Sequence, residues 1–325
     1  MEYKLLGNTG VNVSELCFGT MSFGDTADEA MSAAMYQACR DKGINFFDCA
    51  NVYAGGRSEE ILGKLIAHER DELVITSKVT SPTKGGGINS RGYSRRHIVM
   101  EVEKSLKRLG TDRIDVYFLH HFDPSVPIED VVRTLDDLVK QGKILYPAIS
   151  NWSAWQIALA LGVSEYQNLS RIEVLQPMYS LVKRQAEVEI LPLAKAKNIA
   201  VIPYSPLGGG LLTGKYGTNK KPDGGRIVDN KMYTKRYSEN AYYQVAEDFT
   251  AHAQEKGYHP ATLAVAWAMS HPDVTAPIIG ARNTEQLADS LAALDVDMTP
   301  QWRAEISALS YTPPPAHDRL EEQIG

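Results

Sequence analysis

Four polar residues stand where apolar runs of this sequence end, and their side chains could carry proton chemistry. Asp48 follows the apolar run 44–47, and the phenol of Tyr53 comes five residues later. Lys78 and His120 are each the last residue of a longer apolar run. Taken singly, each is more readily explained as a turn, solvated or packing residue. A shared location would change that interpretation, because the four would then form one proton-handling set.

Together, these side chains suit the delivery of a proton to a carbonyl oxygen as it becomes an alkoxide. A tyrosine with an ordinary pKa near ~10 is a poor acid at neutral pH, and a nearby ammonium lowers that pKa. We therefore expect Lys78 to activate Tyr53, with Asp48 holding the ammonium charged and oriented. His120 could donate a hydrogen bond to the same oxygen. None of the four supplies a hydride, so the reducing equivalent must come from a cofactor.

The rest of the chain alternates apolar runs with segments of helical periodicity. A small hairpin is expected over residues 5–13, followed by eight strand-then-helix units. The expected strands are residues 16–20, 44–47, 73–78, 114–120, 144–149, 172–175, 199–204 and 276–280. The helices expected within these units are residues 27–42, 58 onward, 94–109, 128–141, 153 onward, 187–197, 260–270 and 284–294. Two extra helices are expected over residues 237–256 and 302–309.

Local signals mark several helix starts. Gly55-Gly56 breaks the chain after Tyr53, and Ser58 then predicts an N-cap for the following helix. Pro127 is typical of a first helical turn. Ser153 and Gln156 have the spacing of a capping box. These signals place the loop that carries Tyr53 between a strand and a helix.

Eight strand-helix units within roughly 300 residues match a closed (β/α)8 barrel of the TIM type. The rival, an open doubly wound sheet, usually carries a G-x-G-x-x-G turn after its first strand, and residues 19–24 lack that spacing. We therefore predict an α/β fold, a (β/α)8 barrel, as one domain over residues 1–325. The long Gly- and Lys-rich connection 206–235 is expected to be a functional or mobile loop.

Composition excludes several classes of protein. The 325 residues carry a net charge of −6, which argues against a nucleic-acid or anionic-membrane surface. No apolar run approaches the ~20 residues of a membrane span. The three cysteines include no C-x-x-C pair, and the eight histidines show no metal-ligand spacing, so disulfides and a metal site are not expected. Buried thiols at Cys17 and Cys49 and a cytoplasmic location are expected instead.

The chain resembles the aldo-keto reductases over nearly its whole length. Asp48 and Tyr53 within residues 45–53, Lys78 within 75–78 and His120 within 115–120 look like that family's Asp-Tyr-Lys-His tetrad. The resemblance implies a (β/α)8 barrel that binds NADPH in an extended conformation without a Rossmann motif. It also implies reduction of an aldehyde or ketone, with Tyr53 as the general acid.

The same resemblance implies a set of cofactor-binding residues. Those resembling the nicotinamide end are Ser150, Asn151 and Gln176, which would hold the carboxamide, and Tyr204, the ring that stacks on the nicotinamide. Gly19, Thr20, Met21 and Asp48 are further expected cofactor contacts. Those resembling the pyrophosphate loop are Ser205, Pro206, Leu207, Gly210 and Lys215, with Arg226 as a further phosphate cation. Those resembling the adenosine turn are Gly280, Arg282, Gln286 and Asp289, where the Arg282 guanidinium favours the 2′-phosphate of NADPH. Ser290 departs from the family, which commonly has an asparagine there that contacts the adenine.

Substrate contacts are expected from Tyr53, His120 and Trp152, although Trp152 could instead only pack under its loop. The loops 79–93 and 122–126 and the C-terminal tail are expected to shape the substrate pocket. Gly85-Gly86-Gly87 lacks the spacing of a phosphate loop and fits a flexible substrate-side segment. His121 should point away from His120 by strand alternation.

Two other functions compete with a reductase that acts on a small carbonyl compound. The loop 204–207, the long segment after it and the adenosine turn resemble the branch of the family that includes bacterial reductases and potassium-channel β subunits. An NADPH-binding regulatory module with little turnover is therefore an alternative, against which His120 argues, since channel β subunits generally carry another residue there. A barrel hydrolase or glycosidase would need a second carboxylate near Asp48, and no strand end offers one.

Overall fold

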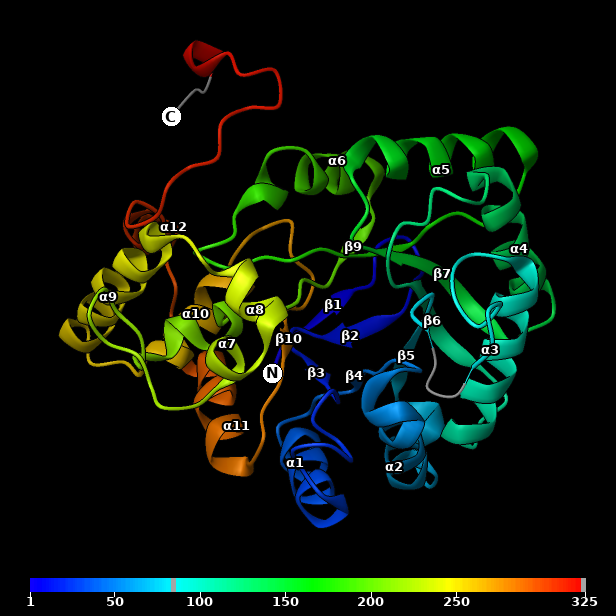
Figure 1. The fold of residues 1–325 in the computed structure, drawn as a ribbon, viewed down its shortest axis with the longest axis horizontal. Coiled ribbons are helices and arrows are strands. Elements are labelled where there is room, and N and C mark those ends of the chain that lie inside the picture. Colours follow the sequence, from blue (N-terminus) through cyan, green and yellow to red (C-terminus); the bar gives the residue numbers. More distant parts are fainter. Residues whose placement is uncertain (83–85, 323–325) are drawn as a thin grey trace.

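Eight parallel strands form the centre of the molecule. The computed structural model describes residues 1–82 and 86–322, and within them the strands follow the order β10-β3-β4-β5-β6-β7-β8-β9. The backbone N–H groups of Thr275 and Ile278 donate at 2.8 Å to the carbonyls of Val201 and Pro203, which joins the two edges of the sheet. The sheet thus closes on itself, and the predicted (β/α)8 barrel is confirmed (Figure 1).

The strands lie close to the expected ranges. They are β3 (Cys17–Gly19), β4 (Phe46–Asp48), β5 (Val74–Val79), β6 (Ile114–Leu119), β7 (Ile144–Ser150), β8 (Val174–Gln176), β9 (Ala200–Val201) and β10 (Ile278–Ile279). The N-terminal hairpin consists of β1 (Tyr3–Leu5) and β2 (Asn12–Ser14), which pair antiparallel.

Helices surround the barrel. Those of the repeating units are α1 (Glu29–Asp41), α2 (Arg57–Ile66), α3 (Arg95–Leu109), α4 (Ile128–Lys140), α5 (Ala154–Gln167), α6 (Ile190–Lys197), α10 (Pro260–Met269) and α11 (Thr284–Leu291). The expected extra helices are α9 (Asn240–Glu255) and α12 (Pro300–Ser307). Short 3-10 helices are η1 (Tyr53–Gly56), η2 (Arg70–Glu72), η3 (Gln185–Glu187), η4 (Gly208–Thr213), η5 (Ala292–Asp295) and η6 (Leu320–Glu322).

The long connection after β9 contains more structure than its composition indicated. Besides η4 it holds α7 (Arg226–Asp229) and α8 (Lys231–Arg236). These helices have only one to two turns, so their apolar residues do not repeat often enough for a helical period to be detected in the sequence.

Of the helix starts marked by a local signal, those at Pro127 and Ser153 were right and the one at Ser58 was wrong. Ser153 and Gln156 form the expected capping box, with the Ser153 backbone N–H donating to the Gln156 side chain at 2.8 Å. Gly56, not Ser58, precedes the first residue of α2. The Ser58 hydroxyl instead donates to the Thr20 carbonyl at 2.7 Å, because the buried end of α2 packs against the loop after β3.

Side chains inside the barrel follow the two-residue period of the strands. The lower, apolar layers are filled by one cluster, which the hairpin residues Leu6 and Val13 complete at the N-terminal end of the strands. Its strand members are Cys17, Phe46, Val74, Val116, Phe118, Ala148, Val174, Ala200 and Ile278. The next inward positions, beyond Phe46 on β4 and Val174 on β8, are Asp48 and Gln176. The top of the barrel is therefore polar, above an apolar floor.

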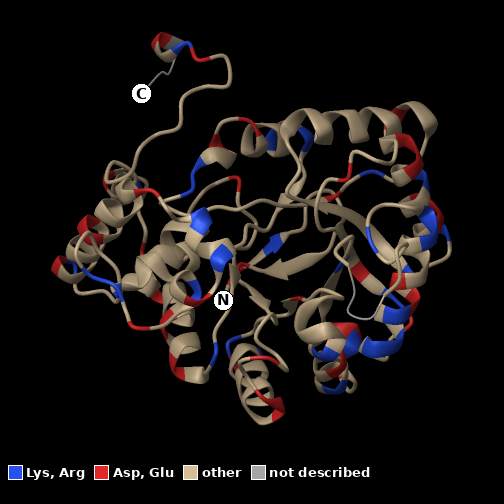
Figure 2. Cartoon of the chain, viewed as in Figure 1, with Lys and Arg blue, Asp and Glu red and all other residues tan. Residues whose placement is uncertain are grey.

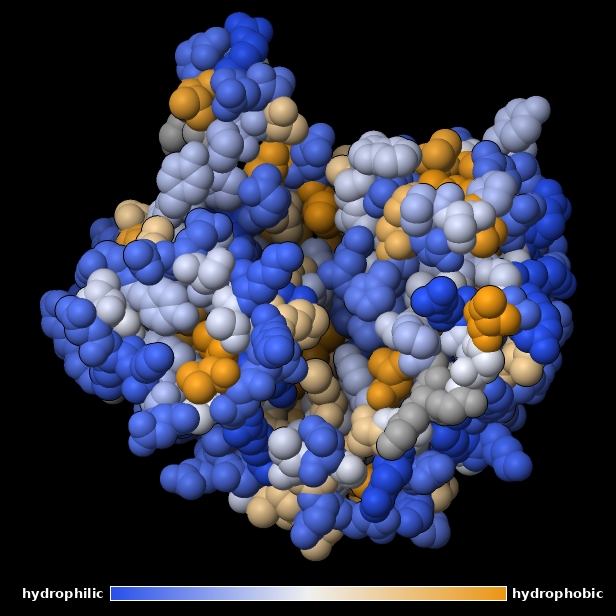
Figure 3. Space-filling model, viewed as in Figure 1, coloured by the Kyte–Doolittle hydropathy of each residue, from blue (hydrophilic) through white to orange (hydrophobic). Residues whose placement is uncertain are grey.

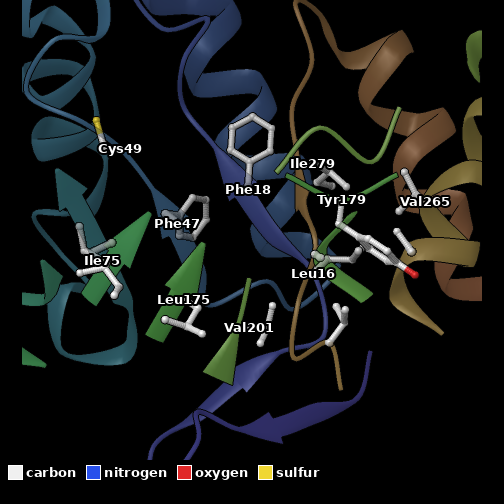
Figure 4. Packing of buried hydrophobic residues seen from close by; sticks show 14 of the residues in the cluster. Leu16, Phe18, Phe47, Cys49, Ile75, Leu175, Tyr179, Val201, Val265 and Ile279 are labelled. Atoms are coloured by element: carbon white, nitrogen blue, oxygen red, sulfur yellow. The ribbon is translucent and has the colours of Figure 1, made fainter. Parts of the chain in front are cut away.

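The alternate positions of the same strands face the helices. Phe18, Phe47, Ile75, Leu175, Val201 and Ile279 all belong to the larger core cluster between sheet and helices (Figure 4). Cys17 and Cys49 are buried, as expected, and are free thiols. Burial on both faces explains why these strands read as continuous apolar runs.

Charged residues lie mainly on the helices and outer loops, while the strands carry few (Figure 2). The face shown in Figure 3 is hollowed at its centre, between α8 and the loops on the opposite side. The C-terminal tail runs away from the barrel instead of covering this hollow (Figure 1). Part of the expected substrate loop, residues 83–85, lies outside the described residues. Among the described helices, none is long and apolar enough to cross a membrane.

The packing of α2 on α3 gives a test of the fold. A Cβ atom at Gly63 would lie 2.6 Å from the Leu109 carbonyl oxygen, a backbone atom that cannot move aside cheaply. Gly63→Ala should therefore lower the free energy of unfolding by about 1–3 kcal/mol, measured by urea denaturation. Gly162→Ala is the matched control, since nothing lies within 4 Å of a Cβ there. It should stabilise the protein by about 0.5–1 kcal/mol, and equal stability of the two variants would contradict the assigned packing.

Candidate active site

The predicted tetrad converges at the polar end of the barrel. The Lys78 Nζ atom lies 2.5 Å from the Asp48 carboxylate, 2.8 Å from the Cys49 carbonyl oxygen and 3.4 Å from the Tyr53 hydroxyl. Lys78 is fully buried and Asp48 nearly so. His120 completes the group, with its ring 6.3 Å from the Tyr53 ring, edge to face.

Strand register brings Asp48 and Lys78 together. Asp48 pairs with Thr76 across β4 and β5, and Lys78 follows two residues later on the same inward face. The second Asp48 oxygen accepts hydrogen bonds from Thr76 at 2.7 Å and from Gln176 at 2.9 Å. A buried charge is tolerated only when it is paired and hydrogen-bonded, and this carboxylate meets both conditions.

The charge state of Lys78 follows from two opposing effects. Burial alone would lower the pKa of the Lys78 ammonium, but the Asp48 carboxylate outweighs burial and holds that pKa above its usual value. The side chain therefore remains an ammonium at neutral pH. Its Nζ atom also lies 5.1 Å from the centre of the Tyr53 ring and 5.8 Å from that of Phe118.

The pKa of Tyr53 moves opposite to the sequence-based expectation. Burial raises it, Lys78 lowers it and Asp48 raises it, with a net rise to about 12. The expected effect of the ammonium is present, but burial outweighs it. Tyr53 thus holds its proton in the resting protein, with Lys78 placed to stabilise the phenolate that remains once the proton leaves.

The loop that carries Tyr53 has an unusual backbone. Ala54, Gly55 and Gly56 have φ values of 49°, 67° and 102°, three left-handed residues in succession. Glycine adopts such angles without a steric penalty, whereas Ala54 does so at a cost of roughly 1 kcal/mol. This reversal lets the chain leave β4, present Tyr53 and enter α2 within a few residues.

His120 is held by its backbone, and its ring is partly buried. The His120 backbone N–H donates to the Val79 carbonyl at 2.8 Å. Burial, followed by the Lys78 charge, lowers the pKa of His120 well below its usual value. Its Nδ1 atom is buried and has no hydrogen-bond partner within the part of the chain that the structure describes.

The expectation for His121 was wrong. The His121 ring stacks on that of His120, with ring centres 4.6 Å apart and planes inclined by only 3°. Strand alternation does not apply here, because β6 ends at Leu119. The two imidazoles therefore lie side by side at the mouth of the barrel.

The residues predicted for the nicotinamide end surround the tetrad. Asn151, with φ of 60°, donates to the His120 carbonyl at 2.9 Å and accepts from the Tyr204 hydroxyl at 2.7 Å. The Ser150 hydroxyl donates to the Gln176 carbonyl at 2.9 Å. These groups offer the donors and acceptors that a carboxamide requires.

The loop after β3 occupies the neighbouring part of the rim. The Thr20 N–H donates to the Asp48 carbonyl at 2.8 Å, and Met21 is partly exposed. Gly19 and Gly280 approach closely, because a Cβ at Gly280 would come within 3.6 Å of the Gly19 carbonyl oxygen. Both therefore lie where β3 and β10 emerge from the barrel.

The predicted phosphate residues lie in three separate segments. Ser205 (φ 60°), Pro206 and Leu207 lead into η4, which contains Gly210. Lys215 and Arg282 are exposed, and the Arg226 guanidinium lies 5.6 Å from the centre of the Tyr233 ring. Over residues 1–82 and 86–322, Lys215, Arg226 and Arg282 form no ion pair with a carboxylate, which leaves three cations for an anionic ligand.

The predicted adenosine turn is organised around the start of α11. The Arg282 backbone N–H donates to the Gln286 side chain at 3.2 Å. Asp289 faces His259, with 3.7 Å between its carboxylate and Nδ1. Ser290 is buried, and its hydroxyl finds no partner among the described residues.

Comparison with known proteins identifies the family. A model described as "Aldo/keto reductase family" matches residues 15–310. This chain belongs to the aldo/keto reductase family.

Named relatives of this aldo/keto reductase fall into two groups. A probable voltage-gated potassium channel subunit beta of Oryza sativa is 37% identical over 97% of this chain and 98% of its own length. An uncharacterized oxidoreductase, YrpG, of Bacillus subtilis is 36% identical over 92% of each chain. A putative aryl-alcohol dehydrogenase, C977.14c, of Schizosaccharomyces pombe is 33% identical over 91% of this chain and 92% of its own length. The family and the two oxidoreductase names support an oxidoreductase.

One feature of the site in this aldo/keto reductase was missed from the sequence. Thr76 donates a hydrogen bond to Asp48, and its position two residues before Lys78 was the signal available.

Trp152, expected as a substrate residue, is only 4% exposed. Its indole N–H donates to the Tyr93 hydroxyl at 2.8 Å, and its ring packs on Phe122. That placement favours the packing alternative. No described group of three or more His, Cys, Asp or Glu side chains is arranged to hold a metal ion.

The lowered pKa of His120 makes the stability of the protein depend on pH. The unfolded chain takes up a proton at this residue as pH falls below ~6.5, and the folded chain does not, so acid should favour unfolding. In urea denaturation, His120 should make the free energy of unfolding of the parent fall by about 1.4 kcal/mol for each pH unit below ~6.5. His120→Gln should remove this contribution. His120→Asn provides a second neutral replacement. A parental pH dependence in both variants would show that His120 is protonated in the folded protein.

Proposed function

We propose that this aldo/keto reductase is an NADPH-dependent enzyme that reduces aldehydes or ketones, with Tyr53 as general acid. The observation that supports this most is the buried chain of phenol, ammonium and carboxylate formed by Tyr53, Lys78 and Asp48. Such a chain is suited to release one proton at a fixed place and to stabilise the anion left behind.

The residues around the rim fit the proposed cofactor. Ser150, Asn151 and Gln176 would hold the carboxamide, and Tyr204 would lie against the nicotinamide ring. Lys215, Arg226 and Arg282 would receive the phosphates, with Gln286 and Asp289 near the adenosine. When bound, NADPH would supply the hydride for the carbonyl carbon.

The protein's own part is the proton. Because the pKa of Tyr53 is raised to about 12, the phenol is protonated at neutral pH and can donate to the developing alkoxide. The phenolate then lies 3.4 Å from the Lys78 ammonium. Asp48 keeps that ammonium in place, and the neutral imidazole of His120 offers one N–H to the same substrate oxygen.

A regulatory module is the second candidate, favoured by the channel-subunit names of several relatives. Such a module would bind NADPH tightly and turn over slowly or not at all.

Turnover separates the two functions. We expect steady NADPH oxidation with an aromatic aldehyde such as nitrobenzaldehyde, measured at 340 nm, and slower oxidation with NADH. A panel of aldehydes and ketones at fixed NADPH would then identify the substrate class. Tight NADPH binding without carbonyl-dependent oxidation across the panel would overturn the reductase and favour the module.

Tyr53→Phe tests the role of the phenol. Reduction should fall by about 100- to 10,000-fold, the usual contribution of a general acid. NADPH affinity, measured by fluorescence titration, should stay close to that of the parent. Tyr311→Phe, in the exposed tail, is the matched control and should reduce at the parental rate. If Tyr53→Phe reduced aldehydes as fast as the parent, the assignment of the proton donor would be wrong.

A further inference from the structure

The loop that presents Tyr53 is tied to α3 on its outer side by one buried hydrogen bond. The Asn51 side-chain amide donates to a carboxylate oxygen of Glu101 at 2.9 Å. Asn51 is 1% exposed and Glu101 is fully buried. Asn51 precedes Tyr53 by two residues, so this contact acts on the backbone immediately before the phenol.

Glu101 is charged despite its burial. Burial raises the pKa of Glu101, but Lys104 and Asn51 outweigh that effect and lower it overall. The Lys104 Nζ atom reaches the other carboxylate oxygen at 2.7 Å. Hydrogen bonds to charged groups are stronger than those between neutral groups, so the bond to Asn51 is a firm one.

A second contact from α3 holds the other end of the same loop. A Cβ atom at Gly56 would meet the Arg108 side chain at 2.9 Å, which shows that the loop backbone lies directly against it. Arg108 binds Glu59 at 2.6 Å, and Glu59 in turn accepts a hydrogen bond from Ser77 at 2.5 Å. Ser77 is the residue before Lys78, so α3 is linked through Glu59 to the strand that supplies the ammonium.

Packing between this loop and α3 is incomplete, although the Asn51 backbone N–H also donates to the Lys78 carbonyl at 3.3 Å. A cavity of about 570 Å3 lies there, lined by Asn51, Val52 and Gly55 of the loop and by Glu101, Lys104 and Arg108 of α3. Where a cavity replaces packed side chains, dispersion contacts cannot fix the loop. Asn51 and Glu101 both line this cavity, and the hydrogen bond that Asn51 donates to Glu101 fixes the loop there.

A stabilising role alone explains the arrangement poorly. A buried carboxylate with its partners is often no more stabilising than apolar residues of the same volume. Its benefit lies in defining position. The 3.4 Å between the Tyr53 hydroxyl and Lys78 is at the upper limit of a hydrogen bond, so a small outward shift of the loop would break it.

We propose that Glu101 is a positioning residue for carbonyl reduction: by holding Asn51, it keeps the Tyr53 hydroxyl within reach of Lys78. This inference rests on the proposed function. Glu101 touches neither substrate nor cofactor and acts only through the loop.

Steady-state kinetics of four variants test the proposal. Glu101→Ala and Asn51→Ala should each lower kcat by about 10- to 100-fold, the effect of a displacement of about 1 Å in a reacting group. KM and NADPH affinity should stay at parental values. The double variant should be no slower than either single variant, since both remove the same bond. Glu101→Gln can still accept from Asn51 and should restore kcat to near the parental rate.

Asp115→Ala is the matched control. Asp115 is also a buried carboxylate in an ion pair, 2.7 Å from Arg70, but it lies at the start of β6, away from the tetrad. The Asp115→Ala variant should have a lower free energy of unfolding than the parent and the same kcat. Parental kcat in both Glu101→Ala and Asn51→Ala, or an equal fall of kcat in Asp115→Ala, would overturn the positioning role.

A turnover-independent measurement separates this proposal from the proposed function. The 13Cζ resonance of Tyr53, assigned with Tyr53→Phe in tyrosine-labelled protein, reports the surroundings of the phenol. It should shift in Glu101→Ala and Asn51→Ala but not in Asp115→Ala. If the parent reduced no carbonyl compound and the shift still occurred, only the reductase would fail. Absence of the shift would overturn the positioning role in either case.

Discussion

The ion pair between Lys78 and Asp48 is the constraint on which the rest of the site depends. Removing an ammonium from water costs several kcal/mol unless a counter-charge and further hydrogen bonds replace the lost hydration. Here one carboxylate receives bonds from Lys78, Thr76 and Gln176, and the Cys49 carbonyl adds another to the lysine. These contributions come from β4, β5 and β8, so only a closed barrel can assemble them. The phenol of Tyr53 is useful because this arrangement already exists beneath it.

In the barrel, the residues that stabilise the fold and the residues of the site lie at different levels along the strands. The lower layers of the barrel are apolar and the hairpin completes them, while polar groups occupy the last inward position of β4, β5, β7 and β8. Helices cover the outer surface through the alternate positions. Because a two-residue period assigns every side chain to one face, a strand can end in a polar residue without disturbing the packing outside it.

The sequence was most informative where a regular period applied. Asp48, Lys78 and His120 could be placed on one face because parallel strands end at the same rim. The prediction for His121 failed just beyond β6, where that period stops. The Ser58 cap failed because a neighbouring loop captured its hydroxyl. The net pKa shift of Tyr53 depends on burial as well as on charge, and burial cannot be read from spacing. The contact between Asn51 and Glu101 joins residues fifty positions apart, and no local pattern indicates it.

The N-terminal hairpin determines which end of the barrel is closed to ligands. Leu6 and Val13 belong to the apolar cluster at the base of the barrel, and Lys4 is tied to the Val274 carbonyl at 3.3 Å. In the described part of the chain, the hairpin therefore closes the base of the barrel, and the polar rim lies at the opposite end. A cofactor and a substrate that both entered at this rim would bind in a fixed order, with the more deeply bound ligand entering first and leaving last.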